Sequence, residues 1–160
     1  MIESPIEHVE LEPGSVDVVA SFETIEHLFS PRELVERCAA LLAPSGLLVL
    51  TCPNSKGFDL LVLRELSETV DNEHLNYFHP RSLAALVESC GLEVLETLTP
   101  GELDAELVRK HVLDGSLDVE RQPFLRHVLV EEWDATGERF QRFLAEAGLS
   151  SHLWLVARKP

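Results

Sequence analysis

Glycine-rich phosphate loops are missing from this chain. Its eight glycines are scattered along 160 residues, and no two of them form a G-x-G. No Gly-Lys-Ser or Gly-Lys-Thr occurs either. Dinucleotide-binding domains and P-loop proteins use such turns to bring backbone amides to a phosphate. The sequence therefore disfavours an unrelated nucleotide-binding or flavodoxin-like domain.

Basic residues are also scarce. The chain has 13 Lys and Arg against 28 Asp and Glu, a formal net charge of −15. Nucleic acids and anionic membranes are bound through clustered Lys and Arg, so we expect neither as a partner. No apolar run approaches the roughly 20 residues that span a bilayer.

Cysteine is rare, and a secretion signal is not recognisable. The three cysteines, Cys38, Cys52 and Cys90, are isolated and lie in apolar contexts. They are typical of small buried hydrophobic side chains in a reducing compartment. The first residues read MIESPIEHVELEPG, an acidic segment without the basic-then-apolar pattern of a signal peptide. We expect a cytoplasmic protein.

The remaining composition is that of a globular domain. Apolar residues make up 45% and charged residues 26% of the chain. A length of 160 residues fits one domain that buries a real core. The sequence therefore predicts a single domain over residues 1–160.

The first half of the chain has the pattern of a strand-helix-strand unit. Residues 16–22, VDVVASF, form a short apolar run that suits a strand covered on both faces. A helix follows, for which Ser30 fits the N-cap, Pro31 the first position and Glu33 a capping box. The second strand is LLVLTCP, ended by Pro53. Parallel strands joined by a right-handed crossover are expected.

The second half is expected to be mostly helical between two further strands. Helical character extends from Asp59 to Glu68, and HPRSLAALVESCG predicts a clean helix. The segments LEVLETLTP and SHLWLVARKP are typical of strands. Residues 99–148 resemble a helical insertion, whose long second helix we expect to be kinked near Gly137.

Polar side chains follow both strands of the strand-helix-strand unit. Ser21, Phe22, Glu23 and Thr24 lie where the first strand ends, and residues 51–54 end the second. Ligands of α/β sheets bind at the carboxyl ends of parallel strands, so these loops should form one wall of a cleft.

Residues 13–54, from PGSVDVVASF to LTCPN, resemble the central part of class I S-adenosylmethionine-dependent methyltransferases. The Glu-x-x-Glu-His of Glu23, Glu26 and His27 is similar to the branch that includes ubiquinone-pathway O-methyltransferases. EHLNYFHPRSLAALVESCGLEVLE and LSSHLWLVARK resemble later parts of the same branch. The resemblance covers most of residues 13–98 and 149–159. It implies a partial Rossmann-like α/β fold, with a mixed sheet of about four strands, two parallel and the last antiparallel.

The family's first strands and their E/D-x-G-x-G-x-G cofactor loop have no counterpart here. The resemblance therefore implies the C-terminal half of a methyltransferase, which we expect not to bind S-adenosylmethionine alone. The alternative is a non-catalytic remnant that dimerises or binds a partner. Without neighbours, the strand at residues 16–22 would lie at a sheet edge, which favours a homodimer through that edge or through the helices of residues 101–147.

Site residues are carried over from the resemblance. It implies a small-molecule methyl acceptor, such as a sugar or sugar nucleotide. His27 and His74 are the catalytic candidates, because an imidazole is a suitable base at neutral pH; a structural role in capping or linking loops is the alternative. Glu23 and Glu26 could also hold a divalent ion, although a carboxylate near a helix start is favoured without one. The expected cofactor contacts are Ser4, Ile6, Ser21, Phe22 and Glu23, and the expected acceptor contacts are Asn54 and Tyr77, for which a core or loop-anchoring role is the alternative.

Overall fold

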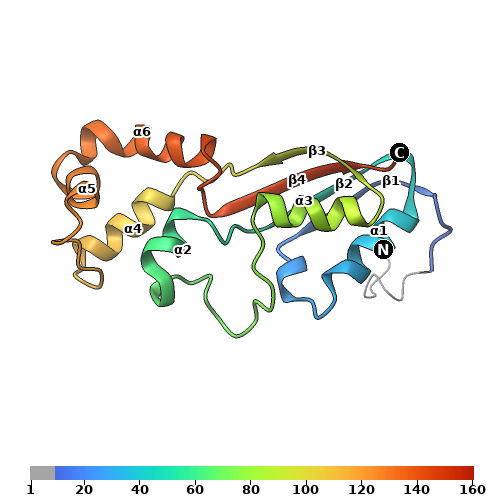
Figure 1. The fold of residues 1–160 in the computed structure, drawn as a ribbon, viewed down its shortest axis with the longest axis horizontal. Coiled ribbons are helices and arrows are strands. Elements are labelled where there is room, and N and C mark those ends of the chain that lie inside the picture. The colour runs from blue at the N-terminus through green and yellow to red at the C-terminus, as the bar shows by residue number, and fades with distance from the viewer. Residues whose placement is uncertain (1–9) are drawn as a thin grey trace.

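A computed structural model describes residues 10–160 of the chain (Figure 1). A mixed sheet lies at one end of an elongated molecule and a group of helices at the other. The strands are β1 (Val16–Phe22), β2 (Leu42–Pro53), β3 (Glu93–Leu98) and β4 (His152–Arg158). The helices are α1 (Pro31–Leu41), α2 (Phe58–Leu63), α3 (Pro80–Ser89), α4 (Asp104–Leu113), α5 (Pro123–Arg126) and α6 (Trp133–Glu146). Shorter turns are η2 (Ile25–His27), η3 (Arg64–Leu66) and the π-helical η4 (His127–Glu131).

The sheet has the strand order β1-β2-β4-β3. β1 pairs with β2 in parallel, and β4 is antiparallel to both β2 and β3. This arrangement confirms the predicted partial Rossmann-like sheet with two parallel strands and an antiparallel last strand. Helix α1 supplies the crossover from β1 to β2, as the sequence predicted.

One face of the sheet carries the main core. Leu48, Leu50 and Cys52 alternate along β2 and are fully buried, as are Leu153 and Leu155 of β4. They pack against residues of α1 and α3, which lie on the same side of the sheet in Figure 1. No helix among residues 10–160 is long and apolar enough to cross a membrane.

The opposite face is more open. Phe22, Thr51, Trp154 and Leu98 form one cross-strand row, in which Phe22 is 57% exposed. β1 pairs with β2 alone among the described strands, so its other edge is free there. The predicted sheet edge is thus present, whereas the homodimer stays a prediction.

Helix starts differ from the prediction in one respect. Ser30 is the N-cap of α1 and Pro31 its first residue, but the predicted capping box is wrong, since the Ser30 side chain makes no capping bond. The Glu33 amide donates to the Ser30 carbonyl instead. A capping box is found at α3, where His79 and Ser82 bond to each other's backbone amides.

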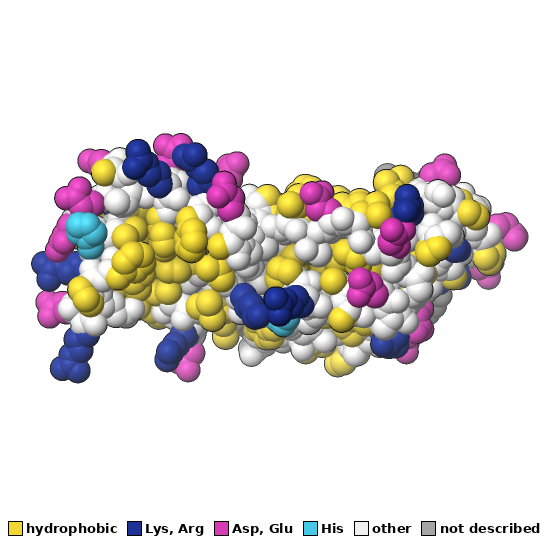
Figure 2. All heavy atoms as spheres, turned by 45° about the horizontal axis from the view of Figure 1, so that its top comes forward, with side chains coloured by type: hydrophobic (Ala, Val, Ile, Leu, Met, Phe, Trp, Pro, Cys, Tyr) yellow, Lys and Arg dark blue, Asp and Glu magenta, His cyan; other side chains and the backbone are white. Residues whose placement is uncertain are grey.

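The helices beyond residue 100 build a second core. Leu63 of α2 packs there with Val108, Leu129 and Leu144. Figure 2 shows hydrophobic side chains gathered on this helical lobe, with charged ones around them. The lobe's exposed apolar residues include Leu103, Leu107, Leu113, Phe124 and Phe143.

The expected kink at Gly137 is wrong, because α6 runs unbroken through that residue. The helical path breaks at Glu132, between η4 and α6. Gly137 has a packing role instead. A Cβ added there would lie 2.9 Å from three atoms of the Trp133 indole.

We predict that Gly137→Ala lowers the free energy of unfolding by about 1 kcal/mol. The better helix propensity of alanine, worth about 1 kcal/mol, is outweighed by the contact with Trp133, since overpacking costs roughly 1–3 kcal/mol. Urea denaturation measures the change. In a Trp133→Leu background the same substitution should stabilise the chain, and an equal loss in both backgrounds would contradict the proposed contact.

Candidate functional site

A cleft of about 340 Å³ opens at the carboxyl ends of β1 and β2. Its walls come from these strand ends, from α2 and the loop after it, and from α4. Four of the chain's seven histidines line it, from four separate segments: His27, His74, His111 and His152. The strand ends predicted to form one wall of a cleft therefore do so at Glu23 and Pro53.

Glu26 is the buried charged residue of this cleft. It lies on η2 and is 1% exposed, yet neither of its carboxylate oxygens has a hydrogen-bond partner among the described residues. Burial raises the pKa of Glu26, and its own backbone amide offsets this only in part. A buried carboxylate with so few donors is costly, which makes Glu26 a candidate ligand for a group that supplies positive charge.

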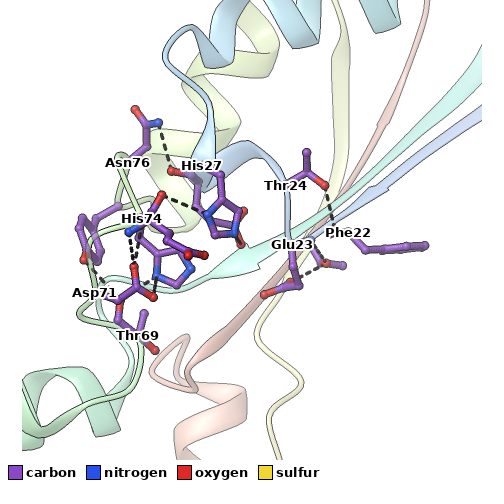
Figure 3. Close-up of polar contacts among 12 residues, drawn as sticks. Phe22, Glu23, Thr24, His27, Thr69, Asp71, His74 and Asn76 are labelled. Carbon is purple, nitrogen blue, oxygen red and sulfur yellow. Dashed lines mark hydrogen bonds and ion pairs between the residues drawn. The ribbon is translucent and has the colours of Figure 1, made fainter. Parts of the chain in front are cut away.

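His27 and His74 lie side by side (Figure 3), with ring centroids 4.7 Å apart. Both belong to one cluster with Glu26. His27 Nδ1 is 3.1 Å from the Glu73 carbonyl oxygen, and His74 Nδ1 is 2.7 Å from that of Thr69. A carbonyl only accepts, so each Nδ1 carries the proton and donates it. Because Nδ1 is the donor in each ring, Nε2 is the atom that can accept or bind a ligand.

These three side chains have the arrangement of a metal site. One ligand atom from each of Glu26, His27 and His74 lies within 4.8 Å of the other two. Ligands about 2.1 Å from one ion are roughly 3–4 Å apart, so small rotations would bring all three onto a shared cation. Imidazole rings held at Nδ1 by carbonyl oxygens are how proteins usually orient such ligands. The residues therefore fit a divalent cation.

Glu23 points to a different partner. It has a left-handed backbone with a φ of 46°, and its amide donates to the Thr51 carbonyl at 3.1 Å. Its carboxylate accepts a hydrogen bond from Thr51 Oγ1 at 2.7 Å and lies 3.3 Å from His152 Nε2. The structure thus places Glu23 outside the cluster of Glu26, His27 and His74, although it lines the same cleft.

The other expected cofactor residues lie on or before β1. Ser21 and Phe22 end that strand, and the Phe22 side chain projects from the open face of the sheet. Neither lines the cleft. Ser4 and Ile6 fall outside the described residues.

The two expected acceptor contacts have other partners. Asn54 is 1% exposed, and its side-chain amide donates to the carbonyl oxygens of Gly148 and Ser150. The Tyr77 hydroxyl donates to the Thr69 carbonyl at 3.3 Å. Neither side chain lines the cleft. These contacts are those of the loop-anchoring alternative.

Sequence reasoning missed several residues that line the cleft. His152 lies at the start of β4, Lys110 and His111 lie on α4, and Asp59 lies on α2. They are far from the Glu-x-x-Glu-His motif in the chain, so no local spacing connects them to it. The one available signal was the position of His152 at the start of the predicted last strand, because an antiparallel strand begins at the edge of the sheet where the parallel strands end.

Comparisons with known proteins show the family and agree with this fold. A family model described as a methyltransferase domain matches residues 4–97. A protein of Mycolicibacterium smegmatis named "Probable S-adenosylmethionine-dependent methyltransferase" is 35% identical over 166 residues, which cover 92% of this chain and 59% of that protein. The ubiquinone biosynthesis O-methyltransferase of Burkholderia thailandensis is 29% identical over 68% of this chain and 49% of its own length. The chain thus spans about half the length of these curated relatives.

Solved structures show the same fold. A methyltransferase of Thermotoga maritima superposes with a TM-score of 0.58 at 15% identity, over 99% of this chain and 63% of its own. The phosphoethanolamine N-methyltransferase 2 of Haemonchus contortus, solved with S-adenosylhomocysteine, superposes with a TM-score of 0.55 at 21% identity. The superposition covers 98% of this chain and 36% of that protein.

We predict a pH signature for Glu26 in metal-free protein. Burial raises the pKa of Glu26 above its ordinary value of 4.5, so the folded chain holds this proton more tightly than the unfolded chain. The associated stability is complete below about pH 4.5 and is lost as the pH rises through the folded pKa. Relative to wild type, Glu26→Gln should therefore gain unfolding free energy from pH 4.5 upward and then level off. Urea denaturation with EDTA measures this, and a constant difference at all pH values would contradict the raised pKa.

Proposed function

Because the chain belongs to the methyltransferase-domain family of S-adenosylmethionine-dependent enzymes, we propose that it methylates an oxygen of a small molecule bound in the cleft, with a divalent cation held by Glu26, His27 and His74. The observation that carries this proposal is the buried Glu26 carboxylate, which lacks hydrogen-bond donors and faces two imidazoles. A cation would offset the cost of burying that carboxylate.

Each residue has a defined part in this proposal. A bound divalent cation would orient a hydroxyl and lower its pKa. The hydroxyl would then release its proton to solvent, as its oxygen takes the methyl group from the sulfonium sulfur of S-adenosylmethionine and leaves S-adenosylhomocysteine. Glu26 contributes the negative charge, while the Nε2 atoms of His27 and His74 contribute neutral ligands whose rings are fixed by the Glu73 and Thr69 carbonyls. The cleft holds the acceptor in line with the methyl group, and this positioning is the main source of rate acceleration in such a transfer.

The cofactor would approach from the carboxyl end of β1. We propose contacts from Ser21, Phe22 and Glu23 there, since these residues end the strand beside the cleft. The match covers only about half the length of this relative, so the similarity does not by itself show the activity of this chain. Methyl transfer by this chain is therefore itself part of the proposal. We take a sugar or sugar nucleotide as the acceptor, which agrees with the hydroxyl and acidic side chains of the cleft wall, such as Ser67, Thr69 and Glu68.

A second candidate function is a partner-binding module without catalysis. It is favoured by the free edge of β1 and by the exposed apolar residues of the helical lobe, because large exposed apolar patches often mark interaction sites. This candidate needs no cation at Glu26, so cation binding separates the two.

We predict that the chain binds Mn²⁺ at one site, measured by loss of the free-ion signal in electron paramagnetic resonance. Glu26→Gln and His74→Gln should each weaken binding at least about 10-fold, because both remove a ligand. His127→Gln is the matched control. His127 lies 3.3 Å from Glu131, another histidine-carboxylate pair, but on the exposed surface of the lobe. Equal binding by wild type and Glu26→Gln would sink the proposed site.

A further inference from the structure

The cleft contains a second buried carboxylate that the proposed cation site does not use. Asp59 on α2 is 5% exposed and lines the cleft, and its Oδ1 atom has no hydrogen-bond partner among the described residues. Ser67 Oγ donates a long hydrogen bond of 3.4 Å to its other oxygen. Burial raises the pKa of Asp59, a hydrogen bond from the Leu60 backbone amide offsets this in part, and the nearby Asp104 carboxylate adds to the rise.

Asp104 on α4 shows how this fold treats a structural carboxylate. It is 1% exposed and accepts hydrogen bonds from the Ser150 hydroxyl, the Ser151 amide and the Gln141 side chain. Although burial opposes the change, these bonds lower the pKa of Asp104. Two neighbouring aspartates are therefore both buried, but Asp104 is held by three donors, whereas Asp59 keeps one oxygen without a hydrogen-bond partner among the described residues.

The groups around Asp59 indicate what it binds. The cleft wall carries the side chains of Ser67, Thr69 and Ser151 together with Lys110. This mixture of donors and acceptors suits a ligand whose groups can both donate and accept, as hydroxyls do. Lys110 disfavours a cationic group in the same space.

We propose that Asp59 is an acceptor-binding residue, whose carboxylate receives a hydrogen bond from a second hydroxyl of a polyhydroxylated methyl acceptor. This inference rests on the proposed function, in which the reacting hydroxyl lies at Glu26, His27 and His74. Two recognition points in one cleft select acceptors that carry at least two hydroxyls. An acceptor with a single hydroxyl leaves Asp59 buried and unpaired, which disfavours its binding.

The first test compares the melting temperatures of Asp59→Asn and Asp104→Asn. If Asp59 is kept for a ligand, removing its charge costs the unliganded fold nothing, and the variant melts at or above the wild-type temperature. Asp104→Asn should melt at least about 2–4 °C lower, since it breaks a bonded network. A fall for Asp59→Asn as large as that for Asp104→Asn would show a structural role and overturn the proposal.

The second test follows backbone amide shifts in ¹⁵N spectra of the Mg²⁺-containing chain. The probes share a six-membered ring: myo-inositol, cyclohexanol and cyclohexylammonium. We expect myo-inositol to shift amides of residues 58–69 in wild type, with the shifts lost in Asp59→Asn, and cyclohexanol to have no effect. Shifts with cyclohexylammonium alone, or no shifts with myo-inositol, would overturn the assignment.

Cation binding keeps the two proposals apart. Asp59→Asn should bind Mn²⁺ as wild type does, because Asp59 is not among the three clustered ligands. If the wild-type chain does not bind Mn²⁺, the proposed function is contradicted. If it binds Mn²⁺ but myo-inositol shifts no amides, only the role of Asp59 is contradicted.

Discussion

The backbone carbonyl of Glu26 holds the site together. It accepts hydrogen bonds from the amides of Leu75 and Asn76, at 2.8 and 2.9 Å. The Asn76 side chain adds a bond to the Leu28 carbonyl at 2.6 Å. These contacts join η2 to the loop that precedes α3, two segments nearly 50 residues apart. They bring His74 against His27 and cover the Glu26 side chain, so the burial of the carboxylate and the pairing of the imidazoles have one origin.

The cleft holds two buried carboxylates beside the apolar core of the sheet. Glu26 and Asp59 both hold carboxylate oxygens that no described residue satisfies, and such groups oppose folding. The sheet core of Leu48, Leu50 and Leu155 provides the compensating burial. Under the proposed ligand binding, stability and function would be in opposition at these two positions, as is common at functional sites.

The sheet and the main helices could be predicted because their signals are local. The apolar run of Val16–Phe22 and the Pro31 helix start depend on neighbouring residues alone. The capping box failed at Ser30 because the backbone carbonyl, rather than the hydroxyl, takes the Glu33 amide. The kink expected at Gly137 was wrong because helix propensity describes single residues and does not show that Gly137 packs against Trp133.

Part of the candidate site was equally accessible. The Glu-x-x-Glu-His motif drew attention to Glu26 and His27, and the strand ends placed them at a cleft. The separation of Glu23 from Glu26 depends on His152, which arrives from the other end of the chain. Asn54 was expected near the acceptor because it ends β2, but its amide is occupied by carbonyls of the segment before β4. Long-range pairings of this kind leave no periodic trace in a sequence.

The bonds of Asp104 also close the base of the helical lobe. Asp104 lies where the chain enters the lobe, and its partners Ser150 and Ser151 lie where the chain leaves it. Thr99 and Ala145 are joined across the same base at 2.9 Å. A segment whose two ends are fastened together can change its length and sequence without disturbing the sheet. Since α4 forms a wall of the cleft, replacement of the lobe would, under the proposed function, be a route by which the same sheet acquires new methyl acceptors.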